Sequence, residues 1–156
     1  MDEDVEAYAG PMVGIDYSPA SVALARTIAA ERGLAHAARF EEADVVHDDL
    51  ARAAWVPPAG FDVVLDKGTF DAISLSDETL PDGRRAVEAY PARVAAVVRR
   101  GGWLVVTSCN WTEEELRARL EGPASGLRWY GRVAYPSFRF GGREGSTICT
   151  VCFQKE

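Results

Sequence analysis

The sequence of 156 residues lacks several features that would assign it to a class of protein. No apolar run approaches the roughly 20 residues that span a bilayer. The acidic start, Met1-Asp-Glu-Asp4, is opposite in charge to a secretory or mitochondrial leader. Acidic residues outnumber basic ones by 24 to 17, a net charge of −7, which would repel a nucleic-acid backbone. We therefore expect no membrane and no nucleic-acid partner, and a cytoplasmic location with the nucleus as an alternative.

Metal-binding side chains are also scarce, with two histidines and three cysteines. Cys149-Thr-Val-Cys152 has the C-x-x-C spacing, but no second pair and no nearby histidine completes a zinc site. The segment is predicted to be a strand, in which positions three apart face opposite sides. We expect no metal site and three reduced, structural cysteines.

The remaining pattern alternates predicted strands and helices in a chain that is 47% hydrophobic, enough for one compact domain. Val63-Val-Leu65 is apolar without alternation, which predicts burial on both faces, as in a parallel sheet. Pro91 predicts a kink inside its helix. The predicted strands cover 12–16, 38–43, 61–66 and 103–109, and the helices 18–33, 50–54, 84–100 and 112–120. Two further strands, at 128–133 and 147–154, form a C-terminal antiparallel hairpin. The fold class is therefore α/β, with a mostly parallel sheet.

Three of the predicted parallel strands end at an acid, namely Asp16, Asp44 and Asp66. In open α/β sheets, ligands bind outside the carboxyl ends of the strands. An acid after the second strand of a nucleotide-binding unit suits the two ribose hydroxyls, and one after the following strand could receive an adenine amino group. Acids at strand ends also commonly cap helices, so both interpretations remain open.

The segment from Asp66 to Ile73 concentrates two acids, a lysine and a glycine directly after a buried strand. Burying such a cluster costs free energy, which suggests that it is kept for a function. The alternative is a simple helix start capped by Thr69 or Asp71.

Four segments together resemble one family. They are Gly14-Ile-Asp-Tyr-Ser-Pro19, Asp66-Lys-Gly-Thr-Phe-Asp-Ala-Ile73, Thr107-Ser-Cys-Asn-Trp-Thr112 with Glu114-Glu-Leu116, and Phe138-Arg-Phe-Gly-Gly-Arg143 with Val151-Cys-Phe-Gln-Lys155. The family is that of the seven-strand lysine methyltransferases that modify translation elongation factor 1-alpha. The resemblance implies a Rossmann-like class I methyltransferase domain over residues 13–156, after an N-terminal remnant of residues 1–12. It also implies a protein substrate, elongation factor 1-alpha, and a monomer.

The resemblance implies S-adenosylmethionine as the cofactor. Asp16 would hold its ribose hydroxyls, Tyr17 would pack beside the adenine, and Asp44 would meet the adenine amino group. The full assignment adds Val45, Asp66 and Gly68 to the cofactor contacts, Asp66, Lys67 and Asp71 to the methyl-transfer end, and Thr69, Phe70, Asn110 and Trp111 to the substrate rim. Trp111 could equally be a packing residue. No dedicated general base is expected, because the sulfonium already carries a good leaving group.

One part of the family pattern is not found. Family members carry a first strand ending in Asp/Glu-x-Gly-x-Gly, whereas residues 1–12 offer only Gly10-Pro11. We therefore expect a truncated chain whose sheet lacks its first strand, between the strand at 12–16 and the strand at 61–66. A catalytically inactive relative that binds a protein partner is the alternative function, and affinity for the cofactor separates the two. A small-molecule methyltransferase is a further alternative, and nothing beyond Asp16 favours a nicotinamide oxidoreductase.

Overall fold

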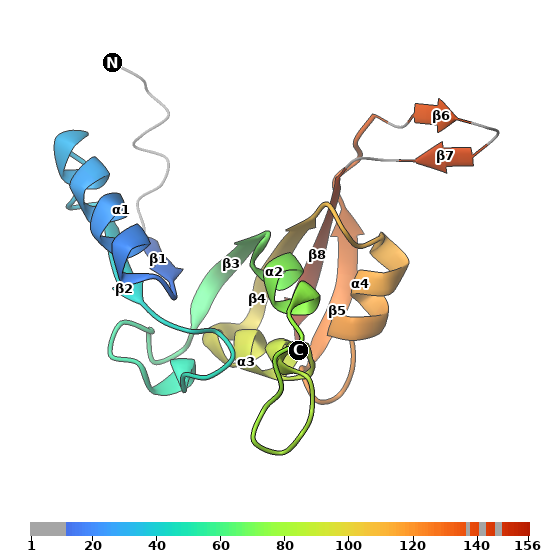
Figure 1. Cartoon of the computed structure of the whole chain (residues 1–156), viewed down its shortest axis with the longest axis horizontal. Coiled ribbons are helices and arrows are strands. Elements are labelled where there is room, and N and C mark those ends of the chain that lie inside the picture. Colours follow the sequence, from blue (N-terminus) through green and yellow to red (C-terminus); the bar gives the residue numbers. More distant parts are fainter. Residues whose placement is uncertain (1–11, 137, 141–142, 146–147) are drawn as a thin grey trace. The chain divides into compact units, whose positions relative to one another are not determined.

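The computed structural model describes residues 12–136, 138–140, 143–145 and 148–156 (Figure 1). The chain divides into two compact units, residues 1–48 and 49–156, and each is described by itself. The predicted remnant before Met12, the Gly141-Gly142 turn and Thr147 lie outside the described residues. In the part that is described, no helix has both the length and the apolar character needed to cross a membrane.

The first unit is a single βαβ element. Strand β1 (Met12–Asp16) pairs in parallel with β2 (Ala38–Glu42), and α1 (Pro19–Glu31) connects them. Helix α1 begins as predicted, because the Ser18 hydroxyl accepts a hydrogen bond from the Ser21 amide at 3.4 Å and Pro19 occupies the first turn. Gly33 follows the helix with a φ of +70°, a conformation that favours glycine.

The second unit contains a four-stranded sheet in the order β3-β4-β8-β5. Strands β3 and β4 are parallel, and β8 runs antiparallel to both β4 and β5, which confirms the predicted C-terminal hairpin. Its elements are η2 (Leu50–Arg52), β3 (Phe61–Lys67), α2 (Thr69–Leu75), η3 (Ala86–Glu88), α3 (Tyr90–Val97), β4 (Val98–Ser108), α4 (Glu113–Leu120), β5 (Leu127–Arg132) and β8 (Cys149–Lys155). A separate two-stranded pair, β6 (Phe138–Phe140) and β7 (Arg143–Gly145), lies between β5 and β8 in the sequence.

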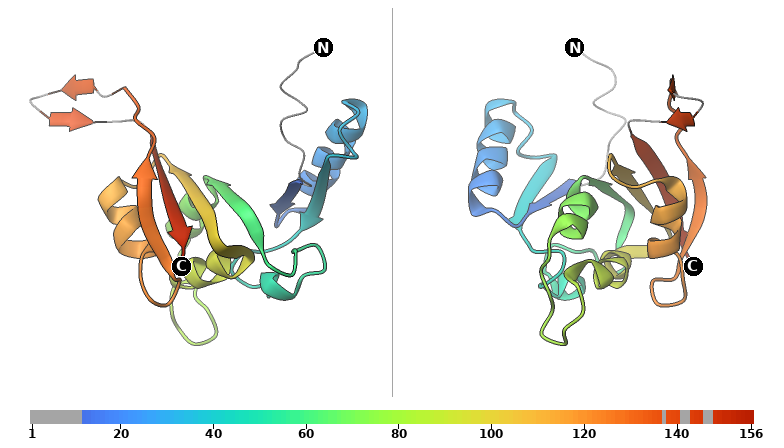
Figure 2. Two further views of the ribbon diagram at one scale, coloured as in Figure 1. Left: turned by 180° about the vertical axis from the view of Figure 1, so that it is seen from behind. Right: turned by 45° about the vertical axis from the view of Figure 1, so that its right-hand side comes forward.

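One face of this sheet forms the core of the second unit. Leu104 and Val106 of β4 alternate with half-buried neighbours and lie opposite Phe153 and Val151 of β8, and all four are fully buried. Helices α2 and α4 lie on the same side of the sheet in Figure 1, and the view from behind in Figure 2 shows the strands of this sheet from the other side. The predicted burial of β3 on both faces is wrong, since Leu65, on the face away from Leu104, is 76% exposed.

The predicted helix over residues 84–100 is shorter than expected. Residues 86–88 form a 3₁₀ turn, and α3 begins only at Tyr90, so Pro91 lies in its first turn and not at an internal kink. Val98 ends the helix because it already pairs with Phe61 of β3, and Arg99 and Arg100 belong to β4. A long-range strand pairing therefore overrides the local helical pattern.

Two smaller predictions hold. Helix α4 opens with the capping box between Thr112 and Glu115. Cys149 lies opposite Ser108 and Cys152 opposite Val105, so the two thiols face opposite sides of the sheet, and both are free. Among the described residues there is no group of three or more histidine, cysteine or acidic side chains that could hold a metal ion. The α/β fold class and the C-terminal antiparallel hairpin are confirmed. The four-stranded sheet is mixed and less parallel than expected, because β3 and β4 are parallel whereas β8 is antiparallel to both β4 and β5.

Candidate functional site

Asp16 ends β1 with a carboxylate that is only partly occupied. Its Oδ1 accepts a hydrogen bond from the Ser18 amide at 2.8 Å. Its backbone carbonyl accepts one from the Ala43 amide at 3.0 Å, which joins the end of β1 to the segment that leaves β2. Within the described residues Oδ2 accepts no hydrogen bond. Asp16 therefore has an acceptor available to a ligand.

Asp44 begins the turn that follows β2 and remains 42% exposed in its side chain. Its Oδ1 accepts hydrogen bonds from the Val46 and His47 amides at 2.8 and 3.1 Å, and its Oδ2 lies 3.1 Å from the His47 Nδ1. Burial tends to raise the pKa of this carboxyl, but the amides and ring of His47 and the amide of Val46 outweigh it and lower the pKa below 3.8. The carboxylate is thus held in its charged form.

Tyr17 and Val45 flank these acids. Tyr17 is 77% exposed, which is unusual for so large an apolar ring, and Val45 is half-buried. The first unit therefore brings Asp16, Tyr17 and Asp44 to the carboxyl edge of its two strands, as the sequence predicts.

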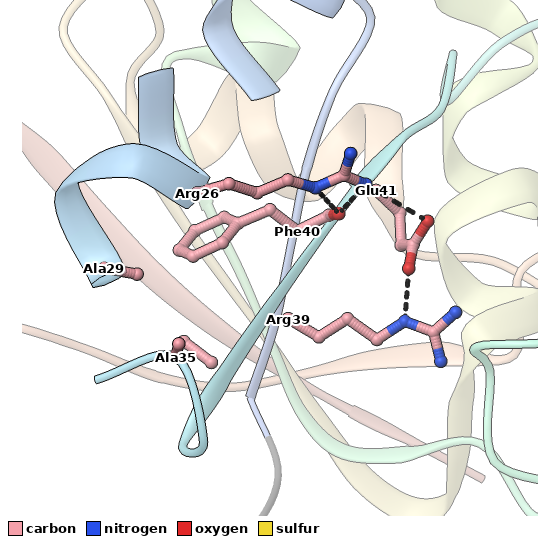
Figure 3. Close-up of a pocket in the computed structure, with 7 residues that line it drawn as sticks. Arg26, Ala29, Ala35, Arg39, Phe40 and Glu41 are labelled. Carbon is pink, nitrogen blue, oxygen red and sulfur yellow. Dashed lines mark hydrogen bonds and ion pairs between the residues drawn. The ribbon is translucent and has the colours of Figure 1, made fainter. Parts of the chain in front are cut away.

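A hollow beside β2 is a second feature of this unit, but its polar groups are already paired (Figure 3). The Arg26 guanidinium donates to the Phe40 carbonyl at 3.0 and 2.5 Å, and Glu41 forms ion pairs with Arg26 and Arg39. The Phe40 ring also covers Gly14, where an added Cβ would lie 2.8 Å from the ring. None of the predicted site residues lines this hollow. We infer that the residues lining it pack α1 against β2.

In the second unit, Asp66 ends the buried face of β3 and is only 6% exposed. Its Oδ1 accepts a hydrogen bond from the Thr69 amide at 3.0 Å, and its Oδ2 accepts one from the Phe70 amide, also at 3.0 Å. These are amides of the first turn of α2, where backbone N–H groups have no partner within the helix. Asp66 is therefore the side chain that caps α2, a role that the sequence had offered to Thr69 or Asp71.

Tyr90 completes the surroundings of Asp66 from α3. Its hydroxyl donates to the Asp66 Oδ2 at 2.5 Å, and the ring is almost fully buried. Burial raises the pKa of Asp66, although the bonds from Tyr90 and α2 oppose this, and burial beside Asp66 raises the pKa of Tyr90 well above 10.0. Tyr90 thus remains protonated near neutral pH and can donate a hydrogen bond to Asp66.

Lys67, which is exposed, and Gly68, which is half-buried, belong to the same turn. Gly68 has a φ of +86° and donates its amide to the Thr107 carbonyl of β4 at 3.2 Å, so a glycine suits this conformation. The Lys67 side chain is exposed and has no hydrogen bond or ion pair with any described residue. Thr69, at the start of α2, is exposed as well.

Phe70 lies in the interior, which corrects its assignment to the substrate rim. It is 1% exposed, and its ring contacts Tyr90 and Trp111, with centroids 5.0 and 6.0 Å away. Phe70 therefore supports the surface residues from below.

Asp71 is similarly buried, at 5% exposure, and both of its carboxylate oxygens are occupied. Oδ1 accepts a hydrogen bond from the Ser108 hydroxyl at 2.5 Å, and Oδ2 accepts one from the Cys109 amide at 3.0 Å. These bonds join α2 to the loop that follows β4. Because β3 and β4 are parallel neighbours, this loop and the Asp66–Thr69 turn lie at the same edge of the sheet.

Asn110 and Trp111 occupy that loop in different ways. Asn110 is exposed, as a rim residue should be. The Trp111 indole donates to the Ser74 hydroxyl at 2.9 Å, and the Arg119 guanidinium lies 4.3 Å from the ring centroid. Trp111 is half-buried, so its main role is to pack against α2, which is the alternative that the sequence left open.

Comparison with known proteins identifies the family to which the chain belongs. A family model described as a methyltransferase domain matches residues 3–136. The chain belongs to this methyltransferase family. It is 40% identical over 149 residues to the protein-lysine N-methyltransferase EFM4 of Saccharomyces cerevisiae, covering 96% of this chain and 62% of the relative. It is 35% identical over 144 residues to the human EEF1A lysine methyltransferase 2, covering 92% and 56%. The chain thus spans little more than half the length of these methyltransferases.

Solved structures of methyltransferases share the fold. A TehB-like SAM-dependent methyltransferase from Corynebacterium glutamicum superposes with a TM-score of 0.64 at 16% identity, covering 94% of this chain and 68% of that one. The [4+2]-cyclase SpnF gives a TM-score of 0.65, also at 16% identity, covering 97% and 70%. At these identities the likeness concerns the methyltransferase fold alone.

Sequence reasoning missed three residues of this site. Tyr90 lies within the helix predicted over residues 84–100 and was given no role in the site, and neither were Ser74 and Ser108. Ser108 had a usable signal, because it is the last residue of a buried strand, where a side chain meets the carboxyl edge of the sheet.

Proposed function

We propose that this chain is the catalytic domain of an S-adenosylmethionine-dependent protein-lysine N-methyltransferase that acts on translation elongation factor 1-alpha. Two relatives with more than 90% coverage of this chain bear the names of lysine methyltransferases, and one name specifies EEF1A. The observation that carries the proposal is the pair of available acids, Asp16 and Asp44, in a chain so similar to these enzymes.

The residues of the first unit fit the cofactor. The open Oδ2 of Asp16 suits a ribose hydroxyl donor, and Asp44 is exposed enough to accept from the adenine amino group. The exposed Tyr17 ring and the half-buried Val45 offer apolar surface to the adenine.

When bound, S-adenosylmethionine supplies a methyl group on a sulfonium, and the neutral thioether that this sulfonium becomes is a good leaving group. The protein then has to present a neutral lysine amine in line with that methyl group. A free lysine has a pKa of about 10.4 and is protonated near neutral pH. A nearby positive charge lowers such a pKa, and Lys67 is an exposed cation at the end of β3. We assign Lys67 this role, with Asp66 and Asp71 supporting the methyl-transfer end of the site from the interior.

The role of Lys67 predicts a shifted pH profile. Lys67→Met should move the rising limb of kcat/KM to higher pH, whereas Lys67→Arg should leave it in place. A profile that is the same in Lys67→Met and in the wild type would contradict this role.

The substrate rim consists of Thr69 and Asn110, which are both exposed. The chain carries a net charge of −7, which favours a basic protein segment as substrate. We further propose that the chain acts as a monomer in the cytoplasm, which sedimentation and localisation of a tagged chain would test.

The deciding experiment is a calorimetric titration with S-adenosylhomocysteine, followed by transfer of radiolabelled methyl groups to purified elongation factor 1-alpha. We expect micromolar binding, about −8 kcal/mol, that Asp16→Ala weakens at least about tenfold. Glu31→Gln is the matched control, because it also removes one negative charge from the first unit but lies at the far end of α1.

Each outcome has a clear meaning. Cofactor binding with methylation of the factor supports the proposal. Cofactor binding without methylation of this substrate would overturn the substrate assignment. A folded chain that binds neither would favour the alternative function, an inactive relative that binds a protein partner.

A further inference from the structure

We propose that Ser108 and Asp71 are positioning residues that hold the loop Cys109–Thr112 in shape, so that its exposed tip can contact the lysine-bearing substrate. The inference rests on the proposed function for the identity of the substrate. It gives Asp71 a different task from contact with the reacting amine, and it assigns a task to Ser108.

The Ser108 hydroxyl makes every hydrogen bond that a hydroxyl can make. It donates its one proton to the Asp71 Oδ1 at 2.5 Å and accepts hydrogen bonds from the Asn110 amide at 3.1 Å and the Trp111 amide at 2.9 Å. Because the carboxylate takes the proton, both lone pairs of the oxygen are directed to the loop amides. The orientation of the loop therefore depends on a charge that lies on another element, α2.

Asp71 binds the loop a second time. Its Oδ2 accepts a hydrogen bond from the Cys109 amide at 3.0 Å, so three successive amides are held by Asp71 and Ser108 together. Both residues are nearly inaccessible, whereas Asn110 is exposed. A carboxylate with two occupied oxygens and 5% exposure is placed to hold a neighbouring loop and not to meet a substrate.

The far end of the loop is tied to the same helix. The Trp111 indole donates to the Ser74 hydroxyl at 2.9 Å, and the Ser74 hydroxyl donates to the Asp71 carbonyl at 2.8 Å. Side chain and backbone of Asp71 thus anchor both ends of a short closed network. The exposed tip at Asn110 is the part left for the substrate.

The test uses the whole chain with three variants. Ser108→Ala removes the central hydroxyl, and Asp71→Asn offers an amide that would compete for the lone pairs of Ser108. Thr107→Val is the matched control, because it removes a hydroxyl from the adjacent residue of β4, one that contacts Thr150 at 2.8 Å on the other face of the sheet. The readouts are amide hydrogen exchange at Asn110 and Trp111, the affinity for S-adenosylhomocysteine, and kcat and KM with elongation factor 1-alpha.

We expect both Ser108→Ala and Asp71→Asn to speed exchange at the two loop amides and to lower kcat/KM by about 10- to 100-fold, chiefly through KM. The double variant should lose no more than the worse single one, because both act through one network. Cofactor affinity should stay within about twofold of the wild type, and Thr107→Val should change none of these readouts.

Other results would overturn the inference. If Asp71→Asn abolishes kcat while Ser108→Ala does not, Asp71 contacts the reacting groups. If exchange speeds up but kcat/KM is unchanged, or if exchange is unchanged, the loop is not positioned for the substrate in this way. If the wild type methylates nothing, the proposed function fails, while the exchange data still decide whether Asp71 and Ser108 hold the loop.

Discussion

Acids stand at the ends of parallel strands in both units, but their surroundings differ. In the first unit, Asp16 makes a single side-chain hydrogen bond and Asp44 is 42% exposed. In the second unit, Asp66 at the end of β3 and its neighbour Asp71 in α2 are both nearly inaccessible, and each carboxylate accepts hydrogen bonds from three donors of the protein itself. An acid that follows a parallel strand is therefore still accessible in the first unit, whereas Asp66 joins elements of the second unit.

The surroundings of these acids differ because residues later in the sequence donate hydrogen bonds to Asp66 and Asp71. Asp66 meets Tyr90 and Asp71 meets Ser108, residues 24 and 37 positions downstream. Among the described residues, the carboxylates of Asp16 and Asp44 bond only to amides and a ring within the next three residues. An acid with only local partners keeps acceptors available, whereas an acid that receives distant donors becomes part of the core.

The largest effect is expected for Asp66→Ala. It would leave the Tyr90 hydroxyl and the amides of Thr69 and Phe70 without an acceptor in a buried place. Since each buried unpaired group costs about 1–3 kcal/mol, we expect the free energy of unfolding to fall by about 3 kcal/mol or more. Urea titration followed by tryptophan fluorescence measures this, because all four tryptophans, Trp55, Trp103, Trp111 and Trp129, belong to the second unit.

The control for Asp66→Ala is Asp62→Ala on the same strand. The Asp62 side chain is 81% exposed and, within the part of the chain that the structure describes, pairs only with Arg99, so its loss should cost less than about 1 kcal/mol. Equal losses in the two variants would show that Asp66 is not the junction described here.

These contacts also explain how far the sequence could predict the structure. The ends of β1 and β2, the cap at Ser18 and the capping box at Thr112 depend on neighbours within a few residues, and they were predicted. The end of α3 was not, because Val98 is drawn into β4 by Phe61, 37 residues earlier. The partners of Asp66 and Asp71 were not predicted for the same reason. A local sequence pattern carries no information on a contact between residues 24 or 37 positions apart.

A smaller loss is expected for Tyr90→Phe. The ring and its contact with Phe70 would stay, but Asp66 would lose one donor. Hydrogen bonds to charged groups contribute about 1.5–3 kcal/mol, and we expect a loss in that range by the same fluorescence measurement. Tyr130→Phe is the control, because Tyr130 is largely exposed and its hydroxyl has no hydrogen bond with any described residue. A comparable loss of unfolding free energy in Tyr130→Phe would show that the hydrogen bond from Tyr90 to Asp66 does not stabilise the fold in this way.

The pH dependence of stability should separate the two kinds of acid. Burial raises the pKa of Asp66 above 3.8, so the folded chain holds this proton more tightly than the unfolded chain. The contribution of Asp66 to the free energy of unfolding is therefore full below pH 3.8 and is lost as the pH rises through the folded pKa. Urea titrations of the wild type and Asp66→Asn over this window should show the wild type losing stability relative to the variant as pH rises.

Asp44 should give the opposite slope. Its folded pKa lies below 3.8, so its contribution is present above pH 3.8 and is lost as the pH falls through the folded pKa. Circular dichroism of the wild type and Asp44→Asn during acid titration would follow it. The same slope for both acids would contradict the contrast between the units.

The smallest effect on stability is expected for Asp16→Ala, although its effect on the cofactor should be the clearest. The substitution removes one partly exposed hydrogen bond to Ser18, which water can replace, so the free energy of unfolding should change by less than about 1 kcal/mol. Tryptophan fluorescence should show no change in the second unit, while affinity for S-adenosylhomocysteine falls. Asp66→Ala should lose stability first and affinity only as a consequence. If Asp16→Ala instead unfolds the chain, Asp16 is a structural acid like Asp66, and the surplus acceptor on its carboxylate would no longer argue for a ligand.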